Sequence, residues 1–216
     1  CSQSRGLGDV YKRQPLMGLF IYLRNTMASG DTKITIVNQA LVLLGSDTIS
    51  SFSDTTNDAA RIADSIYETI KGKTLSLYPW SFALVKEQLA RSTATPVNEW
   101  TYLYPLPSTA VSGTALQVYN SSSTRVLPIQ NYELVYTSSG PAIATNEEKI
   151  YIDYISSVVS EGLMPNYFVQ LLVYMLAWHL AEPVTDQITK AEYWRGVALG
   201  SLTENGRGGY FRQACN

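Results

Sequence analysis

The sequence has very few of the residues that most often carry chemistry. Its 216 residues include one histidine, His179, and two cysteines, Cys1 and Cys215, which lie at opposite ends of the chain. A zinc site needs three or four such ligands close together, so we expect neither a metal site nor a disulfide scaffold. His179 lies in an apolar segment beside Trp178 and is interpreted as a packing or interface residue. We expect no cofactor, because no glycine-rich loop opens a helix as a phosphate site requires.

Charged residues are also scarce. They make up 16% of the chain, and 16 Lys and Arg against 18 Asp and Glu give a net charge of −2. A chain without an excess of cations cannot neutralise many phosphates, which disfavours a protein that reads nucleic acid. The 45% hydrophobic fraction supports a large core and excludes disorder for most of the chain. Fifteen tyrosines and four tryptophans favour β structure and contact surfaces.

The first 26 residues differ from the rest. They have a net charge of +3, which leaves −5 for the remainder. An apolar run at residues 16–23 follows basic residues, as in a short signal peptide, but it is too short to span a bilayer. Residues 4–14 resemble a translated adapter sequence. We therefore expect residues 1–26 to be a non-native leader, with Met27 as the true start and a secretion signal or a native structural segment as the alternatives.

Apolar residues recur at helical spacing in four segments. The first, residues 32–44, is expected to end at Gly45. The second is expected to have Thr55 as its N-cap and Asp58 as its capping-box partner, and to stop before Pro79. Its predicted inward stripe is Ala59, Ile62, Ala63, Ile66, Ile70 and Leu77. Its predicted outward residues are Asp64, Glu68, Lys71 and Lys73.

The third and fourth helices follow near the C-terminus. The third starts at Pro165 and is the most apolar, which predicts a central core helix that Pro183 ends. Thr185 is expected to cap a fourth helix that runs to about Glu204. Its predicted inward residues are Ile188, Ala191, Trp194, Ala198 and Leu202. Residues 205–216 are glycine-rich, and we expect them to form a flexible, extended tail.

Residues 81–156, between the helices, have alternating and aromatic patterns typical of β-strands. Candidate strands are residues 82–89, 101–104, 116–119, 132–136 and 149–155, with turn signals that include residues 138–141. The predicted fold class is α+β: an antiparallel helical bundle of about four helices with an inserted small antiparallel β-sheet. The helical domain comprises residues 27–80 and 157–204, and the β-rich subdomain comprises residues 81–156.

Paired carboxylates are the remaining candidates for catalysis. Glu147, Glu148, Asp153 and Glu161 could in principle support glycoside hydrolysis. Adjacent acids in a polar turn are usually only solvated, so the chain is not expected to be an enzyme.

Six short motifs follow one another along residues 34–202. A helix with Ile-Val-Asn-Gln-Ala-Leu at 36–41 precedes an Asn-Asp-Ala-Ala helix start at 57–60. A Tyr-Pro-Trp-Ser-Phe-Ala junction at 78–83 leads to a Trp-x-Tyr-x-Tyr-x-Leu-Pro segment at 100–107 and a Tyr-x-x-Tyr strand at 151–154. A helix pair that opens with Pro165 and Phe168 completes the series. The residues interpreted as structural anchors are Asn57, Asp58, Tyr67, Pro79, Trp80, Phe82, Trp100, Tyr102 and Tyr104.

This ordered set resembles the head-to-tail adaptor family of tailed phages, in particular the tail tubular protein A type of short-tailed phages. The resemblance implies a structural virion protein at the head–tail junction, assembled in the host cytoplasm. Such adaptors form a ring, usually a dodecamer, that extends the DNA channel and helps to retain the packaged genome. The implied partners are further copies of the chain, the portal protein, a downstream tail or nozzle protein, and double-stranded DNA that passes without sequence recognition. No membrane partner is implied.

Two regions have expected roles in such an adaptor. Trp80 and Phe82 are predicted to point to the same side of the strand after Pro79 and to pin the sheet to the bundle. The tail is expected to order on the portal, with Arg207, Tyr210, Phe211 and Arg212 as contact residues. Two alternatives stay open: a virion-associated peptidoglycan hydrolase that uses paired carboxylates, and a non-viral binding module with a tyrosine-lined groove.

Overall fold

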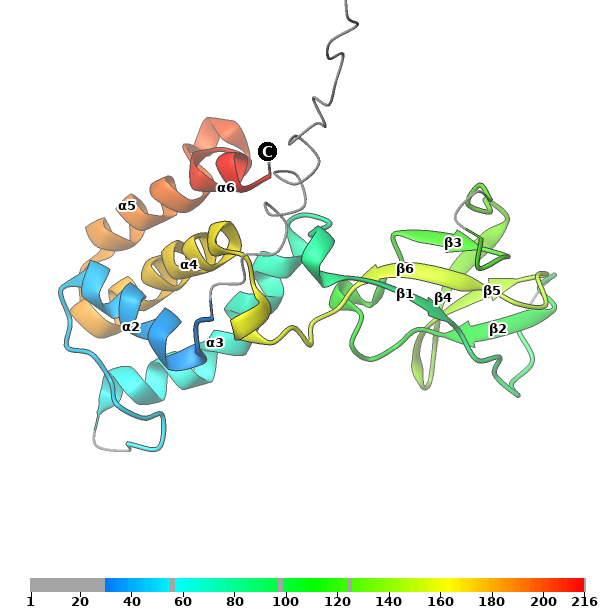
Figure 1. Cartoon of the computed structure of the whole chain (residues 1–216), viewed down its shortest axis with the longest axis horizontal. Helices are drawn as coiled ribbons and strands as arrows, with labels where there is room; N and C mark the ends of the chain where they lie inside the picture. The colour runs from blue at the N-terminus through cyan, green and yellow to red at the C-terminus, as the bar shows by residue number, and fades with distance from the viewer. Residues whose placement is uncertain (1–29, 55–56, 97–98, 124–125, 216) are drawn as a thin grey trace, which may run out of the picture.

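The chain folds into a helical lobe and a β lobe that lie end to end (Figure 1). The computed structural model describes residues 30–54, 57–96, 99–123 and 126–215. The expected leader and the expected cap Thr55 lie outside these residues. Helices and antiparallel strands together confirm the α+β class. Within the described ranges, none of the helices combines the length and the apolar character that a membrane span requires.

Helix α2 (Lys33–Leu44) has the ends that its sequence predicts. Its N-cap Thr32 accepts a hydrogen bond from the Thr35 amide at 3.3 Å, and the Thr35 hydroxyl accepts one from the Thr32 amide at 2.8 Å. Gly45 then adopts a left-handed conformation with φ 72°, and its amide donates to the carbonyl of Leu41. Local capping chemistry is therefore sufficient to define this helix.

Helix α3 (Asp58–Ser76) starts differently from the prediction. Its N-cap is Asn57, whose side-chain oxygen accepts from the Ala60 amide at 3.2 Å, so Asp58 is the first helical residue and not a capping partner. The predicted inward stripe is also displaced around the helix. Leu77 is 38% exposed, whereas Lys71, predicted to face outward, is 6% exposed. The buried residues of α3 are Ala60, Ala63, Tyr67, Ile70, Lys71, Thr74 and Leu75.

Helix α4 (Asn166–Thr185) is the central helix and packs against α2, α3, α5 and α6. The prediction that Pro183 ends it is wrong, because the helix continues for two more residues. Proline has no amide donor, but Pro183 lies on the exposed side of the helix, and other hydrogen bonds hold the last turn. The Thr185 hydroxyl donates to the Ala181 carbonyl at 2.6 Å, and the Asp186 amide donates to the Glu182 carbonyl at 2.9 Å.

Helix α5 (Ile188–Leu199) has Gln187 as its N-cap, so the prediction of a Thr185 cap is wrong. The helix ends at Gly200, and a short 3-10 turn, η4 (Leu202–Glu204), follows it. Ala198 is buried as predicted, but Ile188 and Leu202 are 60% and 77% exposed, so their predicted inward positions are wrong.

The C-terminal segment is folded, which corrects the expectation of an extended tail. Helix α6 (Gly209–Ala214) packs on α4 and α5, and its Phe211 is buried. The glycines before it permit this close return of the chain. A Cβ at Gly209 would lie 2.6 Å from the Val197 carbonyl oxygen, and its φ of 54° also favours glycine. The glycine-rich sequence therefore encodes a tight turn against α5.

The β lobe contains two three-stranded antiparallel sheets where one was predicted. Their orders are β1 (Leu84–Gln88), β6 (Tyr151–Ile155), β3 (Gln117–Tyr119) and β2 (Tyr102–Pro105), β5 (Gly140–Thr145), β4 (Tyr132–Thr137). All five predicted strands occur with shifted ends, but β5 was interpreted as part of a turn. The first strand starts late, because a 3-10 turn, η1 (Ser81–Ala83), precedes it. The lobe has its own core, which includes Tyr104, Val118, Ile143, Ile150, Ile152 and Tyr154.

Candidate functional site

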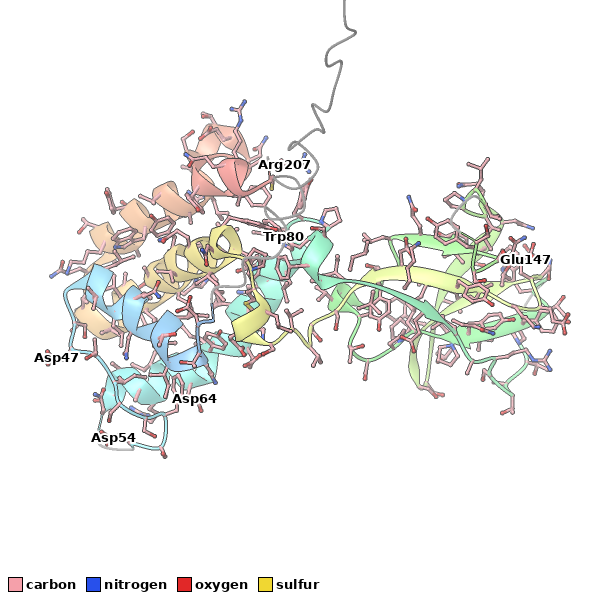
Figure 2. The ribbon with its side chains drawn as sticks, in the orientation of Figure 1. Asp47, Asp54, Asp64, Trp80, Glu147 and Arg207 are labelled. Carbon is pink, nitrogen blue, oxygen red and sulfur yellow. The ribbon has the colours of Figure 1, made fainter. Side chains whose placement is uncertain are left out.

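An aromatic cluster lies where the two lobes join, with Trp80 at its centre (Figure 2). The Trp80 side chain is 1% exposed, and its indole nitrogen donates to the Thr74 carbonyl at 3.1 Å. The polar end of the indole is therefore satisfied where it is buried. Ring centroids near Trp80 are those of Tyr78 and Phe168 at 5.2 Å, Tyr167 at 6.1 Å, Phe82 at 6.2 Å and Phe211 at 6.3 Å.

This cluster joins segments that are far apart in the sequence. Trp80 and Phe82 come from the junction motif, Phe168 comes from the first turn of α4, and Phe211 comes from α6. Phe82 also contacts Phe168, with ring centroids 4.8 Å apart. These ring contacts join the junction motif to α4 and α6 and include no strand residue, so the role in pinning the sheet stays a prediction. The predicted geometry is wrong, because Trp80 directly precedes a 3-10 turn and Phe82 lies within it, so the two do not share one face of a strand.

A buried ion pair anchors the second connection between the lobes. Lys71 of α3 donates to Glu161 at 2.8 Å, and the Tyr67 hydroxyl donates to the same carboxylate oxygen at 3.4 Å. Glu161 lies in η3 (Glu161–Leu163), between β6 and α4. Burial is the largest single influence on the pKa of Glu161 and would raise it, but the hydrogen bond and charge of Lys71, a backbone hydrogen bond and the Tyr67 hydroxyl together outweigh burial and lower the pKa. Burial, and then the Glu161 charge, raise the pKa of Tyr67.

The other anchor residues are distributed over both lobes. Asn57 caps α3, and Pro79 directly precedes Trp80. In the β lobe, the Trp100 indole donates to Glu133 at 2.8 Å, while Tyr102 and Tyr104 lie on β2 and pack into the lobe core. The anchors therefore stabilise the two lobes and their junction, and they do not form one pocket.

The candidate catalytic carboxylates do not converge. Glu161 is engaged by Lys71 in the helical lobe, whereas Glu147 lies in the β lobe, at the end remote from the bundle (Figure 2). The backbone carbonyls of Glu147 and Glu148 accept from the Tyr104 hydroxyl at 2.9 and 2.6 Å, which fixes this turn structurally. Asp153 is paired with Lys86 at 2.8 Å. Asp153 lines a pocket that none of the other three acids lines, so the four acids do not face one another across a shared pocket of the described residues.

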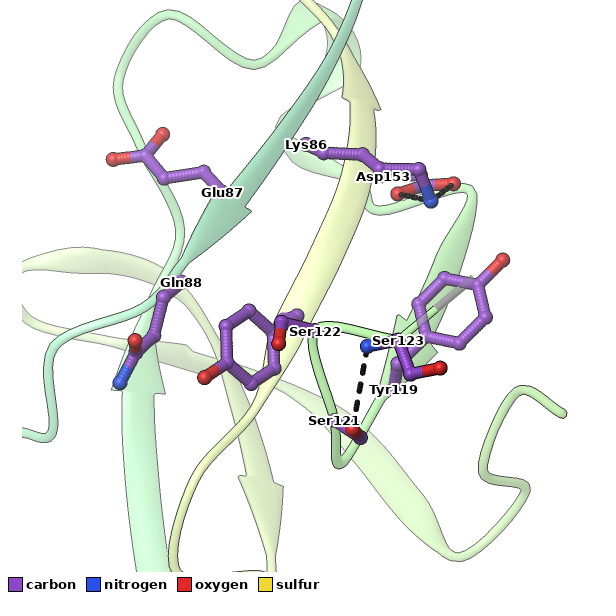
Figure 3. Close-up of a pocket in the computed structure, with 9 residues that line it drawn as sticks. Lys86, Glu87, Gln88, Tyr119, Ser121, Ser122, Ser123 and Asp153 are labelled. Atoms are coloured by element: carbon purple, nitrogen blue, oxygen red, sulfur yellow. Dashed lines mark hydrogen bonds and ion pairs between the residues drawn. The ribbon is translucent and has the colours of Figure 1, made fainter. Parts of the chain in front are cut away.

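A small hollow lies on the outer face of the β1–β6–β3 sheet (Figure 3). Its volume is about 260 Å³, and it lies beside the Lys86–Asp153 pair. Lys86 is held over the Tyr119 ring, 4.7 Å from its centroid, and the hydrogen bond to Asp153 raises the pKa of Lys86. Glu87 points away from the hollow, because it accepts from the Tyr154 hydroxyl at 2.9 Å. The opposite charges of Lys86 and Asp153 offset each other, so this pair gives the hollow no strong preference for a charged ligand.

His179 has the environment of a packed residue. Its Nδ1 donates to the Met175 carbonyl at 2.8 Å, one turn earlier in α4, and its ring lies 4.1 Å from the Trp178 ring. Burial is the main cause that lowers the pKa of His179, which keeps the imidazole neutral at physiological pH.

The four residues predicted to bind a portal divide into two pairs. Arg207 and Arg212 are exposed, and Arg207 projects from the bundle near α6 (Figure 2). Phe211 is buried against Trp80, and Tyr210 packs edge-on against Tyr174 with centroids 5.4 Å apart. The two aromatic residues thus hold α6 in place, and the two arginines are accessible.

No group of three or more His, Cys, Asp or Glu in the part of the chain described here is arranged to hold a metal ion. Comparison with models of known protein families and with curated proteins finds no match for this chain.

Proposed function

We propose that this chain is a structural virion protein, the subunit of a head-to-tail adaptor ring that joins a portal to a tail. The observation that carries the proposal is the convergence of the motif residues on the junction. Trp80 and Phe82 of the junction motif and Phe168 of the helix-pair motif form one aromatic cluster where the lobes join. Two motifs of the series thus meet at the point where the bundle continues into the β lobe.

The architecture fits the mechanical task of an adaptor. One connection between the lobes is fixed by Trp80 and the other by the Lys71–Glu161 pair. Two fixed connections restrict rotation of the β lobe relative to the bundle. A subunit of this kind would use its bundle to pack beside neighbouring copies and its β lobe to contact a downstream tail or nozzle protein.

The electrostatic properties suit a channel for DNA. The chain from residue 27 has a net charge of −5. A negative lumen repels phosphates, so double-stranded DNA would slide through it without being bound or read. The ring would thereby extend the portal channel and help to retain the packaged genome. The exposed pair Arg207 and Arg212 offers a basic contact for an acidic surface of a neighbouring protein.

Co-purification with a portal protein tests the proposal. The full chain would be co-expressed with the portal protein from the same genome, and the product examined by size-exclusion chromatography and negative-stain electron microscopy. We expect ring-shaped particles that contain both proteins. Elution of the chain as a monomer, separate from intact portal rings, would refute the adaptor function.

A further inference from the structure

The outer face of α5 has large apolar side chains that the described residues leave exposed. Ile188 is 60% exposed and Tyr193 is 63% exposed, and they lie at the two margins of the exposed face of α5, with Glu192 and Gly196 between them. The opposite side of α5 is well packed, since the Trp194 ring stacks on Tyr174 at 5.7 Å. An isolated helix face of this kind is typical of a contact surface.

Two helix-interior glycines have no explanation within one chain. Gly196 lies in α5 and Gly72 lies in α3, and a Cβ added to either would have no heavy atom within 4 Å. Neither glycine has a positive φ, so the backbone does not require glycine either. Glycine in a helix is less stable than alanine. Close approach of another backbone is a physical reason to keep glycine at both positions.

The outer face of α3 carries small side chains where that of α5 carries bulky ones. The small residues follow one stripe of α3 at helical spacing: Ser65, Thr69, Gly72 and Ser76. Bulky side chains of one helix can pack between the ridges of another where small residues let the backbones approach, and Ile188 and Tyr193 have the size for such a contact. In the fold, α3 and α5 lie on opposite sides of α4 (Figure 1).

The two faces also have opposite charge. Residues 46–76, the α3 edge, hold five acids against Arg61 and Lys73, apart from the buried Lys71, and Lys33 of α2 pairs with Asp64 at 2.7 Å, so the edge keeps a net negative charge. Residues 188–215, the α5 edge, hold four cations against Glu192 and Glu204. Asp47, Asp54 and Asp64 lie along one edge of the bundle, and Arg207 lies across the bundle from them (Figure 2). Edges of opposite charge on one molecule attract the edges of further copies.

We infer that the α5 edge of one copy docks on the α3 edge of the next copy. Ile188 and Tyr193 enter the stripe around Gly72, while the basic residues of the α5 edge face the acids of the α3 edge. Because different surfaces meet, the contact is heterologous and repeats around a ring or along a filament. The inference names the interface of the ring, and its closure into a ring rests on the proposed adaptor function.

Charge reversal on each edge tests this interface. Variant A is Arg207→Glu with Arg212→Glu, and variant B is Asp47→Arg with Glu68→Arg. Each should weaken self-association about 100-fold, because like charges then meet. The combination of A and B in one chain should restore assembly, since both edges are reversed together. An equimolar mixture of A and B should also assemble. In variant A both edges are acidic and in variant B both edges are basic, so copies of A and B can alternate.

The matched control is Lys149→Glu, an exposed reversal in the β lobe that should leave assembly unchanged. Assembly would be measured by sedimentation velocity, and the fold of each variant by circular dichroism. Rings that form with portal protein but do not respond to A or B would overturn the interface and leave the adaptor function standing. Edge-dependent association without portal binding would support the interface and refute the function. A chain that stays monomeric with and without portal would refute both.

Discussion

Replacement of Trp80 tests whether the aromatic cluster holds the fold together. The side chain is almost fully buried, and its ring contacts those of Tyr78, Phe168 and Phe211. Trp80→Ala would remove these contacts, leave a cavity and abolish the hydrogen bond to Thr74. Truncation of a large buried aromatic residue destabilises a protein by about 3–5 kcal/mol. Domains of ordinary stability have a free energy of unfolding of about 5–15 kcal/mol, so the variant should approach the limit of folding.

The assay is equilibrium unfolding in urea, followed by fluorescence and by far-ultraviolet circular dichroism. Trp80→Phe is the graded variant. It keeps one aromatic ring in the cluster but loses the indole hydrogen bond, which is worth about 1 kcal/mol, together with part of the packing. Tyr136→Ala is the surface control, because Tyr136 is 75% exposed and its loss should change stability by about 0.5 kcal/mol or less.

The relative stabilities of the three variants test whether the aromatic cluster holds the fold together. We expect Trp80→Ala to be the least stable, Trp80→Phe intermediate and Tyr136→Ala close to wild type. A loss below about 1 kcal/mol for Trp80→Ala would show that the cluster relaxes without cost, contrary to its central position. It would also remove the physical support for a rigid junction between the lobes.

Three further predictions concern α3 and α5. Lys71→Met should destabilise the chain by about 2 kcal/mol in urea unfolding, because Glu161 is left largely buried without its cation, and Lys71→Met with Glu161→Leu should recover most of that loss. Because the folded protein lowers the pKa of Glu161, its ion pair stabilises fully above the unfolded pKa of about 4.5 and is lost as pH falls through the folded value. The stability advantage of wild type over Glu161→Gln should therefore disappear on acidification below pH 4.5, and an advantage that persists to pH 2 would contradict the sign of the shift. Gly196→Ala should stabilise the monomer by about 1 kcal/mol in thermal melts yet weaken self-association, and a variant that assembles as well as wild type would count against the interface.

Helix α2 shows which features the sequence defines well. Thr32 and Thr35 form the cap, and Gly45 ends the helix, so both boundaries depend on residues adjacent to them. The strand positions were also predicted to within a few residues, because alternation is a local signal.

The errors arose where hydrogen bonds or packing override a local signal. Pro183 has no amide donor for the His179 carbonyl, yet α4 continues, because the Thr185 hydroxyl and the Asp186 amide hold its last turn on Ala181 and Glu182. Gly140 and Pro141 belong to β5, since they pair with Thr137 and Tyr136 of β4 across a shorter turn. The tail folds back because Phe211 finds an apolar site beside Trp80. Of these contacts, only the one between Phe211 and Trp80 is distant in sequence, so the folded tail is the error that local pattern could not have avoided.

Lys71 shows how a signal can be present and still be missed. It lies on the same side of α3 as Tyr67 and Thr74, four residues before and three after it, and both of these are fully buried. A lysine in that position predicts an acidic partner from elsewhere in the chain. Glu161 was considered only as a catalytic acid. The predicted inward stripe of α3 was built from aliphatic residues alone, and this is why Lys71 was placed on the outward face.

Helix α3 connects the proposed interface to the orientation of the β lobe. Its Thr74 carbonyl holds Trp80, and its Lys71 holds Glu161, so both connections to the β lobe are attached to this one helix. Gly72, at the centre of the proposed interface, lies between these two attachment points in the sequence. A neighbouring copy that docks on α3 would therefore fix the segment that carries the β lobe. Ring closure and alignment of the β lobes would then be one event, as a channel continued from portal to tail requires.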